Sequence, residues 1–223
     1  GQLMDQSFET SGEMAGLLHW LYEDNAQIKI RNALFLDALN LDDFSSEESE
    51  AGLPKIPEWL WLNSKLRFNT FEYKNFLASN VDLNLQHRGN STQLYDVQLD
   101  VARGKMSGKV DLNYSEKGLS IRSSSDFSQL DLANIFLYFD QFGQSTLTSK
   151  NLEGTVSGSS KINMSFNSDF EFVPSRLLGE AELVVVEGRL KNFGAMDAVA
   201  EFFDSNIILR KVFKANELRS RLK

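Results

Sequence analysis

The fold of this chain is decided by the stretch Gly104-Lys-Met-Ser-Gly-Lys-Val-Asp-Leu-Asn-Tyr114, in which apolar side chains fall on every second residue. Alternate residues of an extended strand point to opposite faces, so Met106 and Leu112 share one side. The same signature recurs in residues 152–166 and, with a longer apolar run, in residues 178–193. Repeated long strands of this kind predict a large β-sheet with one apolar face and one polar face. The apolar face of such a sheet must either be covered by other parts of the chain or bind an apolar ligand.

Composition narrows the class of partner. The chain has 223 residues, 42% of them hydrophobic, with 17 Phe, which suits one large domain or two small ones with a real core. Its 23 Lys and Arg against 31 Asp and Glu give a formal charge of −8, which argues against a nucleic-acid partner and leaves small ligands, lipids and proteins open. The absence of Cys excludes a disulfide, a thiolate zinc site and a Cys nucleophile.

Targeting signals are missing from the sequence as it stands. It holds no apolar run of about 18 residues that would predict a transmembrane helix, and no signal peptide. The chain opens with Gly1 rather than Met, so we expect it to be an excerpt of a longer protein.

Periodicity along the chain predicts strands with a few helices between them. Helical spacing of Leu and Met predicts an amphipathic helix over Gly12–Tyr22, capped by Ser11, and further helices over Asp131–Phe142 and Gly194–Phe203. Alternation predicts a strand over Ile28–Leu41 and mostly strands from Lys65 onward. Further expected features are a mobile acidic and Pro-containing loop over residues 42–58, hairpin turns at His87–Ser91 and Glu116–Gly118, and a strand with a basic end over Ile207–Lys223.

These elements together predict an α+β fold. We expect a mostly antiparallel, large, curved, one-sided β-sheet with a few short helices packed on it. Residues 1–223 would form a single β-rich domain.

Ordered blocks of the sequence resemble the AsmA-like family of bacterial envelope proteins, which are related to bridge-like lipid carriers. The blocks are Leu36-Asp-Ala-Leu-Asn-Leu-Asp-Asp-Phe44, Leu53-Pro-Lys-Ile-Pro-Glu-Trp-Leu60, Leu66-Arg-Phe-Asn-Thr-Phe-Glu-Tyr-Lys-Asn75, Gly104-Lys-Met-Ser-Gly108, and Gly179–Leu190, similar to the family's late strand pair, followed by the Ala195–Phe203 helix. The resemblance spans residues 34–203 and rests on the order and spacing of the blocks. Residues 1–27 do not match the family, and the membrane anchor expected near its N-terminus is absent from this sequence.

The resemblance implies a function and a place in the cell. It implies a long curved sheet with an apolar inner surface, in the periplasm of a Gram-negative cell, with the intact protein held in the inner membrane. It implies a non-enzymatic role in outer-membrane biogenesis, with glycerophospholipid transport along the sheet. A phospholipid or other acyl-chain ligand is then the expected partner, envelope proteins are further partners, and no cofactor is expected.

An apolar set on the predicted strands is the candidate binding site. Its strongest members are Tyr95, Val97, Leu99, Val101, Met106, Val110, Leu112, Tyr114, Ile162, Met164 and Phe166. One interpretation is a groove for acyl chains, in which each buried CH₂ contributes about 0.8 kcal/mol without polar recognition. The other is an ordinary core covered by the predicted helices.

No arrangement of reactive residues predicts an enzyme. His19 lies on the first predicted helix and His87 in a predicted turn, and neither has a second His nearby. The acidic residues from Asp42 to Glu50 lack the alternating ligands and turning Gly of a calcium loop, so they predict a solvated loop. The Ser-rich segments, such as Ser123-Ser-Ser125, carry no Gly-x-Ser-x-Gly elbow and are interpreted as polar strand faces.

Two alternatives to a lipid carrier stay open. One is a structural or protein-interaction module of the envelope that uses a sheet edge or the acidic loop. The other, ranked last, is a hydrolase on a β-scaffold. The basic C-terminal residues would either meet anionic lipid headgroups or form a solvated end.

Overall fold

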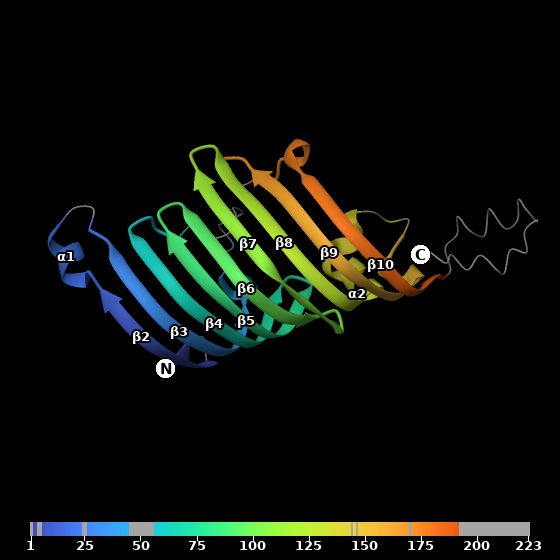
Figure 1. The fold of residues 1–223 in the computed structure, drawn as a ribbon, viewed down its shortest axis with the longest axis horizontal. Coiled ribbons are helices and arrows are strands. Elements are labelled where there is room, and N and C mark those ends of the chain that lie inside the picture. The colour runs from blue at the N-terminus through green and yellow to red at the C-terminus, as the bar shows by residue number, and fades with distance from the viewer. Residues whose placement is uncertain are drawn as a thin grey trace, which may run out of the picture.

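A computed structural model describes residues 2–3, 6–23, 26–44, 56–143, 145, 147–169 and 171–191. Within these residues the chain forms one sheet of ten strands that lie side by side in chain order (Figure 1). The strands are β1 (Gln2–Leu3), β2 (Gln6–Ala15), β3 (Ile28–Asn40), β4 (Leu60–Tyr73), β5 (Phe76–Arg88), β6 (Ser91–Val101), β7 (Gly104–Ser115), β8 (Gly118–Asp131), β9 (Leu152–Phe166) and β10 (Leu178–Leu190). The helices are α1 (Leu17–Tyr22) and α2 (Leu132–Tyr138), with 3₁₀ turns η1 (Leu41–Phe44), η2 (Asp140–Gly143), η3 (Ser149–Asn151) and η4 (Pro174–Arg176).

The predicted α+β class is wrong, because the described part of the chain is essentially all-β. Its α-helices are only six and seven residues long, whereas β4, β5, β8 and β9 each run for 13 residues or more. The sheet is also mixed. Strands β3 and β4 pair in parallel, with Leu34 opposite Leu66, while the other neighbours are antiparallel. Because β3 and β4 are parallel, both strands begin at the same end of the sheet, so the ten strands do not form an uninterrupted antiparallel meander.

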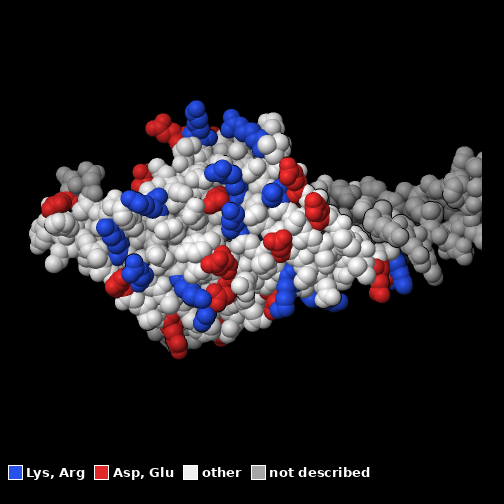
Figure 2. Space-filling view, in the orientation of Figure 1, with Lys and Arg blue, Asp and Glu red and all other residues white. Residues whose placement is uncertain are grey.

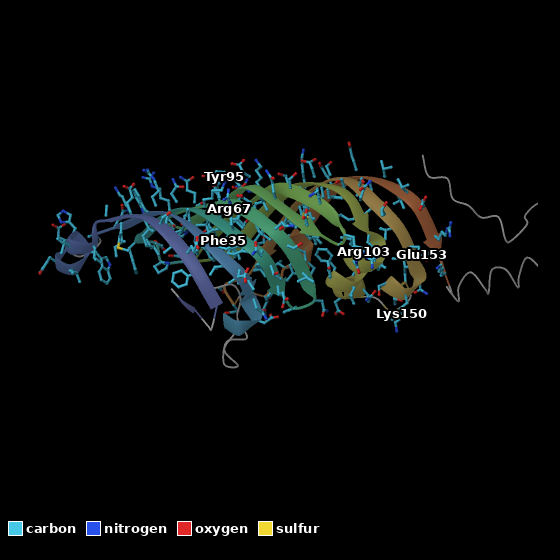
Figure 3. All side chains as sticks on the ribbon, turned by 90° about the horizontal axis from the view of Figure 1, so that it is seen from below. Phe35, Arg67, Tyr95, Arg103, Lys150 and Glu153 are labelled. Carbon is cyan, nitrogen blue, oxygen red and sulfur yellow. The ribbon has the colours of Figure 1, made fainter. Side chains whose placement is uncertain are left out.

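Polarity separates the two faces of the sheet. Leu34, Leu66 and Leu83 stand side by side on β3, β4 and β5, and the charged Arg67 and Asp82 pair on the opposite face. Figure 3 shows the sheet as an arch, with Arg67 on the convex side and α2 beneath the concave side. We call the side that carries Leu34, Leu66 and Leu83 the concave face.

Three bulges keep the apolar residues on the concave face along these long strands. Asn80, Asp96 and Gln129 have positive φ angles of 51°, 50° and 55°, and each coincides with a shift of register in β5, β6 or β8. A bulge adds one residue, so the alternation changes phase there and the strand bends more strongly. Ala78 and Val81 therefore both face the core, and both are at least 94% buried.

The main core sits at one end of the concave face, under α2. Leu36, Phe68, Val101, Leu130 and Val156 belong to this cluster, and Leu132, Ile135 and Tyr138 of α2 pack on it at helical spacing. The Asp131 carboxylate caps the helix by accepting a hydrogen bond from the Asn134 N–H at 2.9 Å. The helix predicted over Asp131–Phe142 is confirmed for Leu132–Tyr138 as α2, but it ends earlier than predicted, because Asp140, Gln141 and Phe142 have positive φ angles.

The first predicted helix begins later than expected. Residues 12–15 belong to β2, which pairs with β3 from Phe8 opposite Leu36 to Ala15 opposite Lys29. Ladder hydrogen bonds over this stretch outweigh a helical pattern that rests on a few Leu residues. Gly16, with φ +86°, ends the strand and begins α1, so Ser11 is a strand residue and not a cap.

Other expectations fall partly or wholly outside the described residues. In the predicted loop, residues 42–44 belong to η1 and 56–59 lead into β4, while 45–55 lie outside the description. The Gly194–Phe203 helix and the Ile207–Lys223 segment also lie outside it. Gly179–Leu190, likened to a strand pair, lies within the single strand β10. Where the chain is described, none of its helices has the length and apolarity to cross a bilayer.

Candidate functional site

The concave face holds ten of the eleven candidate residues, because the strand register brings them side by side. One row crosses Leu112 on β7, Ile121 on β8 and Met164 on β9. The next crosses Val110, Ser123 and Ile162. The ten residues are Val97, Leu99, Val101, Met106, Val110, Leu112, Tyr114, Ile162, Met164 and Phe166.

Tyr95 is the exception, and its prediction is wrong. It pairs with Asn84, whose neighbours Leu83 and Leu85 face the core, so Tyr95 lies on the other side. Figure 3 shows Tyr95 on the convex side of the arch, like Arg67. The cause is the bulge at Asp96, which adds a residue between Leu94 and Val97. Both of these side chains therefore face the concave side, and the alternation that placed Tyr95 there does not hold across the bulge.

The candidate residues divide into two groups along the strands. Val97, Leu99, Val101 and Met106 join the cluster under α2, where Val101 is 3% exposed. Toward the other end of the strands, Val110, Leu112, Tyr114, Ile162, Met164 and Phe166 form what we call the open half. Apart from Leu112, at 9% exposed, the side chains of the open half are only partly buried.

The cover over the open half is slight where the structure describes it. Phe172, from the segment after β9, bridges to Phe166, and their ring centroids are 5.8 Å apart. Phe172 is itself 44% exposed. The helix α2 lies at the other end of the strands, where Tyr138 contacts Phe76 with ring centroids 5.6 Å apart.

Hydroxyl groups interrupt the apolar rows, and Ser64, Ser125 and Ser160 each have a hydrogen-bond partner on a neighbouring strand. The Ser125 and Ser160 hydroxyls lie 2.8 Å apart between β8 and β9, and the Ser64 hydroxyl donates to the side-chain amide oxygen Oδ1 of Asn32 at 2.5 Å. Within the described residues no buried side-chain nitrogen or oxygen lacks a partner. The interpretation of residues 123–125 as a polar strand face is therefore only partly right, because Ser123 and Ser125 stand in concave rows opposite Ile162 and Ser160.

The convex face carries charge instead. Figure 2 shows Lys, Arg, Asp and Glu spread over it, and neighbouring strands join them in ion pairs. Arg67 Nε lies 2.8 Å and Lys65 Nζ 3.4 Å from the Asp82 carboxylate. Hydrogen bonds from Lys105 and then Asn80 lower the pKa of Asp100. A shallow hollow of about 700 Å³ on this face is lined mostly by polar groups, among them Asp100, Lys105 and Asp126.

His87 is a buried strand residue, not part of a turn as predicted. It is 1% exposed at the end of β5, with Nε2 3.2 Å from the Pro57 carbonyl oxygen and Nδ1 2.7 Å from Thr92 Oγ1. Because a carbonyl only accepts, Nε2 donates the proton and Nδ1 accepts from the Thr92 hydroxyl. Burial lowers the pKa of His87 more than the Pro57 hydrogen bond raises it. This neutral imidazole anchors the segment that leads into β4.

The remaining reactive groups show structural contacts. Burial raises the pKa of the Tyr114 hydroxyl. His19 lies 3.5 Å from the Glu23 carboxylate on the exposed side of α1. Asp42 accepts the backbone N–H of Lys74 at 2.8 Å, which ties η1 to the β4–β5 turn. No group of three or more His, Asp or Glu residues that could hold a metal ion occurs in the described ranges.

Several residues of the concave face were not among the candidates. Leu94, Leu119, Ile121 and Phe127 stand in its rows beside residues that were. Leu119 and Ile121 alternate in the sequence, so the period of two could have found them. Phe127 follows the Ser-rich segment, which hides the pattern.

No protein-family model matches the chain, and a search of the curated proteins finds no match.

Proposed function

We propose that this chain is a non-enzymatic acyl-chain carrier whose concave face shields phospholipid tails from water. The observation that supports this proposal is the open half, a set of neighbouring apolar side chains of which all but Leu112 stay only partly buried within the sheet. A contiguous apolar surface that stays partly exposed in this way can serve as a binding site.

The dimensions of the concave face suit such a ligand. Its rows run across the strands from β3 to β9, which is seven neighbouring strands. At about 4.8 Å between strands, a row is about 29 Å long. The hydrocarbon core of a bilayer is about 30 Å thick and holds two acyl chains end to end. A row is thus long enough for a whole acyl chain, and the row through Leu112 includes the buried polar side chains Thr92 on β6 and His87 on β5.

The chemistry of the two faces supports a tail-binding role. Each CH₂ taken from water contributes about 0.8 kcal/mol, so several methylenes in contact with Val110, Ile121 and Ile162 suffice for binding. The paired hydroxyls of Ser125 and Ser160 need no polar partner from the ligand. The convex charges keep the opposite face in water.

The cellular role in the proposal rests on the resemblance of the ordered sequence blocks to AsmA-like proteins. We place the chain in the periplasm, as part of a protein held in the inner membrane and active in outer-membrane biogenesis. Phospholipid traffic between the membranes is the corresponding task.

Lipid analysis of the purified chain tests the proposal. Mass spectrometry of an organic extract is expected to find phospholipid, and the delipidated chain is expected to take up a fluorescent phospholipid. Ile162→Glu places a charge on the concave face and is expected to abolish uptake, while Asn163→Glu places the same charge on the convex face and is expected to preserve it. Absence of lipid together with absence of uptake would refute a carrier role.

One observation favours a second candidate, a protein-interaction module. Strand β10 pairs with β9 alone among the described strands, and it exposes apolar side chains on both faces, with Leu183 57% and Val184 62% exposed. Such an edge can accept a strand from another chain. Concentration-dependent self-association of the lipid-free chain that Val184→Lys abolishes would favour this candidate.

A further inference from the structure

An exposed apolar cluster occupies the end of the sheet at α1, away from the open half. Five side chains of α1 and its approach are 46–86% exposed. They are Met14, Leu17, Leu18, Leu21 and Tyr22. Helix α1 has no buried residue, so these side chains do not serve the core. Figure 1 shows α1 at one extreme of the long axis of the sheet.

All three tryptophans of the chain lie at this end. Trp20 of α1 contacts Trp59, which precedes β4, with ring centroids 5.3 Å apart. Trp61, two residues further, lies on the convex face opposite Lys29 of β3. Trp and Tyr are the residues that prefer the boundary between bilayer and water, because each combines an apolar ring with a polar group.

Two cationic side chains, Lys29 and Arg88, lie on the convex face next to the apolar cluster. Lys29 Nζ lies 4.8 Å and Arg88 Cζ 4.2 Å from the centre of the Trp61 ring. Both cations line a hollow of about 460 Å³ on the convex face, together with Arg31. Arg31 pairs with Glu13, whereas the contacts described for Lys29 and Arg88 are those with the Trp61 ring. Ala15 also lines this hollow, and Gly16 then begins α1, so hollow and cluster are adjacent.

We infer that the α1 end docks on the surface of an anionic phospholipid bilayer. Leu18, Leu21 and Tyr22 enter the interface, Trp20 and Trp59 lie at headgroup level, and Lys29 and Arg88 contact lipid phosphates. Interfacial helices bind membranes in this way, by apolar insertion combined with attraction of cations to anionic lipid. The inference is independent of acyl-chain binding on the concave face, because it involves different residues on another part of the sheet.

Tryptophan fluorescence reads this surface directly, since no Trp lies elsewhere in the chain. The whole chain is titrated with vesicles of phosphatidylcholine, with and without phosphatidylglycerol. We expect a blue shift of the emission with the anionic vesicles, quenching by phosphatidylcholine brominated on its acyl chains, and weaker binding as salt rises. Absence of both shift and quenching with anionic vesicles would overturn the inference.

Matched variants locate the contact. The double variant Leu18→Asp, Leu21→Asp is expected to weaken vesicle binding roughly tenfold or more, and Lys29→Gln and Arg88→Gln about fivefold each. Leu178→Asp removes a similarly exposed Leu, 67% against 72% for Leu18, at the far edge of the sheet and is expected to have no effect. Equal loss in Leu178→Asp, or self-association through the α1 cluster without vesicle binding, would overturn the inference in favour of general stickiness or a protein partner.

The two proposals can fail separately. Ile162→Glu is expected to lose phospholipid uptake and keep vesicle binding. The α1 double variant is expected to keep the lipid content of the purified chain and lose vesicle binding. If Ile162→Glu lost vesicle binding as well, the vesicle signal would come from lipid transfer to the concave face, and docking by α1 would be refuted.

Discussion

Leu130→Ala and Met164→Ala, compared in the lipid-free chain, test whether the concave face is core at one end and open at the other. Leu130 is 2% exposed and lies opposite Val156, in the cluster on which α2 packs. Met164 is only partly buried in the open half. The two substitutions remove similar numbers of apolar atoms, so the difference between their effects reports the surroundings.

The expected magnitudes follow from burial. Leu130→Ala removes three methyl or methylene equivalents, about 2.4 kcal/mol of transfer free energy. The cavity beneath α2 adds to this, and we expect a loss of about 3–4 kcal/mol in the free energy of unfolding. The Met164 side chain is packed on one side only, so Met164→Ala removes only about half of the transfer free energy and leaves no closed cavity. We therefore expect a loss of about 1 kcal/mol in the free energy of unfolding.

Urea unfolding of the delipidated variants, followed by circular dichroism, measures both losses. Leu137→Ala on α2, where Leu137 is 46% exposed, serves as the control for removal of an exposed Leu from this region and is expected to cost less than about 1 kcal/mol. A loss in Met164→Ala as large as that in Leu130→Ala would refute the reasoning. It would mean that the open half is sealed core and has no room for a ligand.

Two further predictions concern the frame of the sheet. Burial holds the pKa of His87 below its ordinary value of 6.5. Below about pH 6.5 the unfolded chain therefore binds a proton that the folded chain does not. The contribution of His87 to stability is complete above about pH 6.5, and the free energy of unfolding falls by up to about 1.4 kcal/mol per pH unit as the pH drops toward the folded pKa. Urea unfolding at about pH 7.5 and about pH 5.5 should show this loss, and His87→Gln should reduce it; an unchanged pH dependence in that variant would contradict the assignment. Gly118→Ala is expected to cost about 2 kcal/mol or more, because Gly118 has φ +117° and an added Cβ would stand 2.0 Å from the Phe166 carbonyl oxygen. Gly89→Ala, at φ +60° with open space around it, should cost less in the same urea assay, and equal losses would contradict the close approach as the cause.

The strands were predictable from the sequence because their signal is local. Alternation in residues 104–114 and 152–166 reflects the opposite directions of neighbouring side chains, and the structure has β7 and β9 there. The turns at 89–90 and 116–117 follow from Gly and polar residues between two such runs. The helix α2 was also found, because Leu132, Ile135 and Tyr138 recur at helical spacing.

The errors arose where distant residues decide the structure. The parallel pairing of β3 with β4 depends on how the segment between them returns, which no local pattern states. Bulges at Asn80, Asp96 and Gln129 use residues other than Gly at positive φ. Asn and Asp tolerate that conformation, but they also occur at many other strand positions, so they do not by themselves predict a bulge, and Tyr95 was placed on the wrong face in consequence. His87 was assigned to a turn because its burial depends on Pro57, thirty residues away in the chain.

Photo-crosslinking along β9 tests the central claim most directly. A photoreactive phenylalanine derivative is placed in turn at positions 161, 162, 163 and 164 of the whole chain, in the presence of phospholipid. Register puts Ile162 and Met164 on the concave face and Lys161 and Asn163 on the convex face. A carrier whose concave face holds the acyl chain should give lipid adducts at 162 and 164 and none at 161 and 163. Adducts at all four positions, or at none of them, would contradict lipid binding on the concave face.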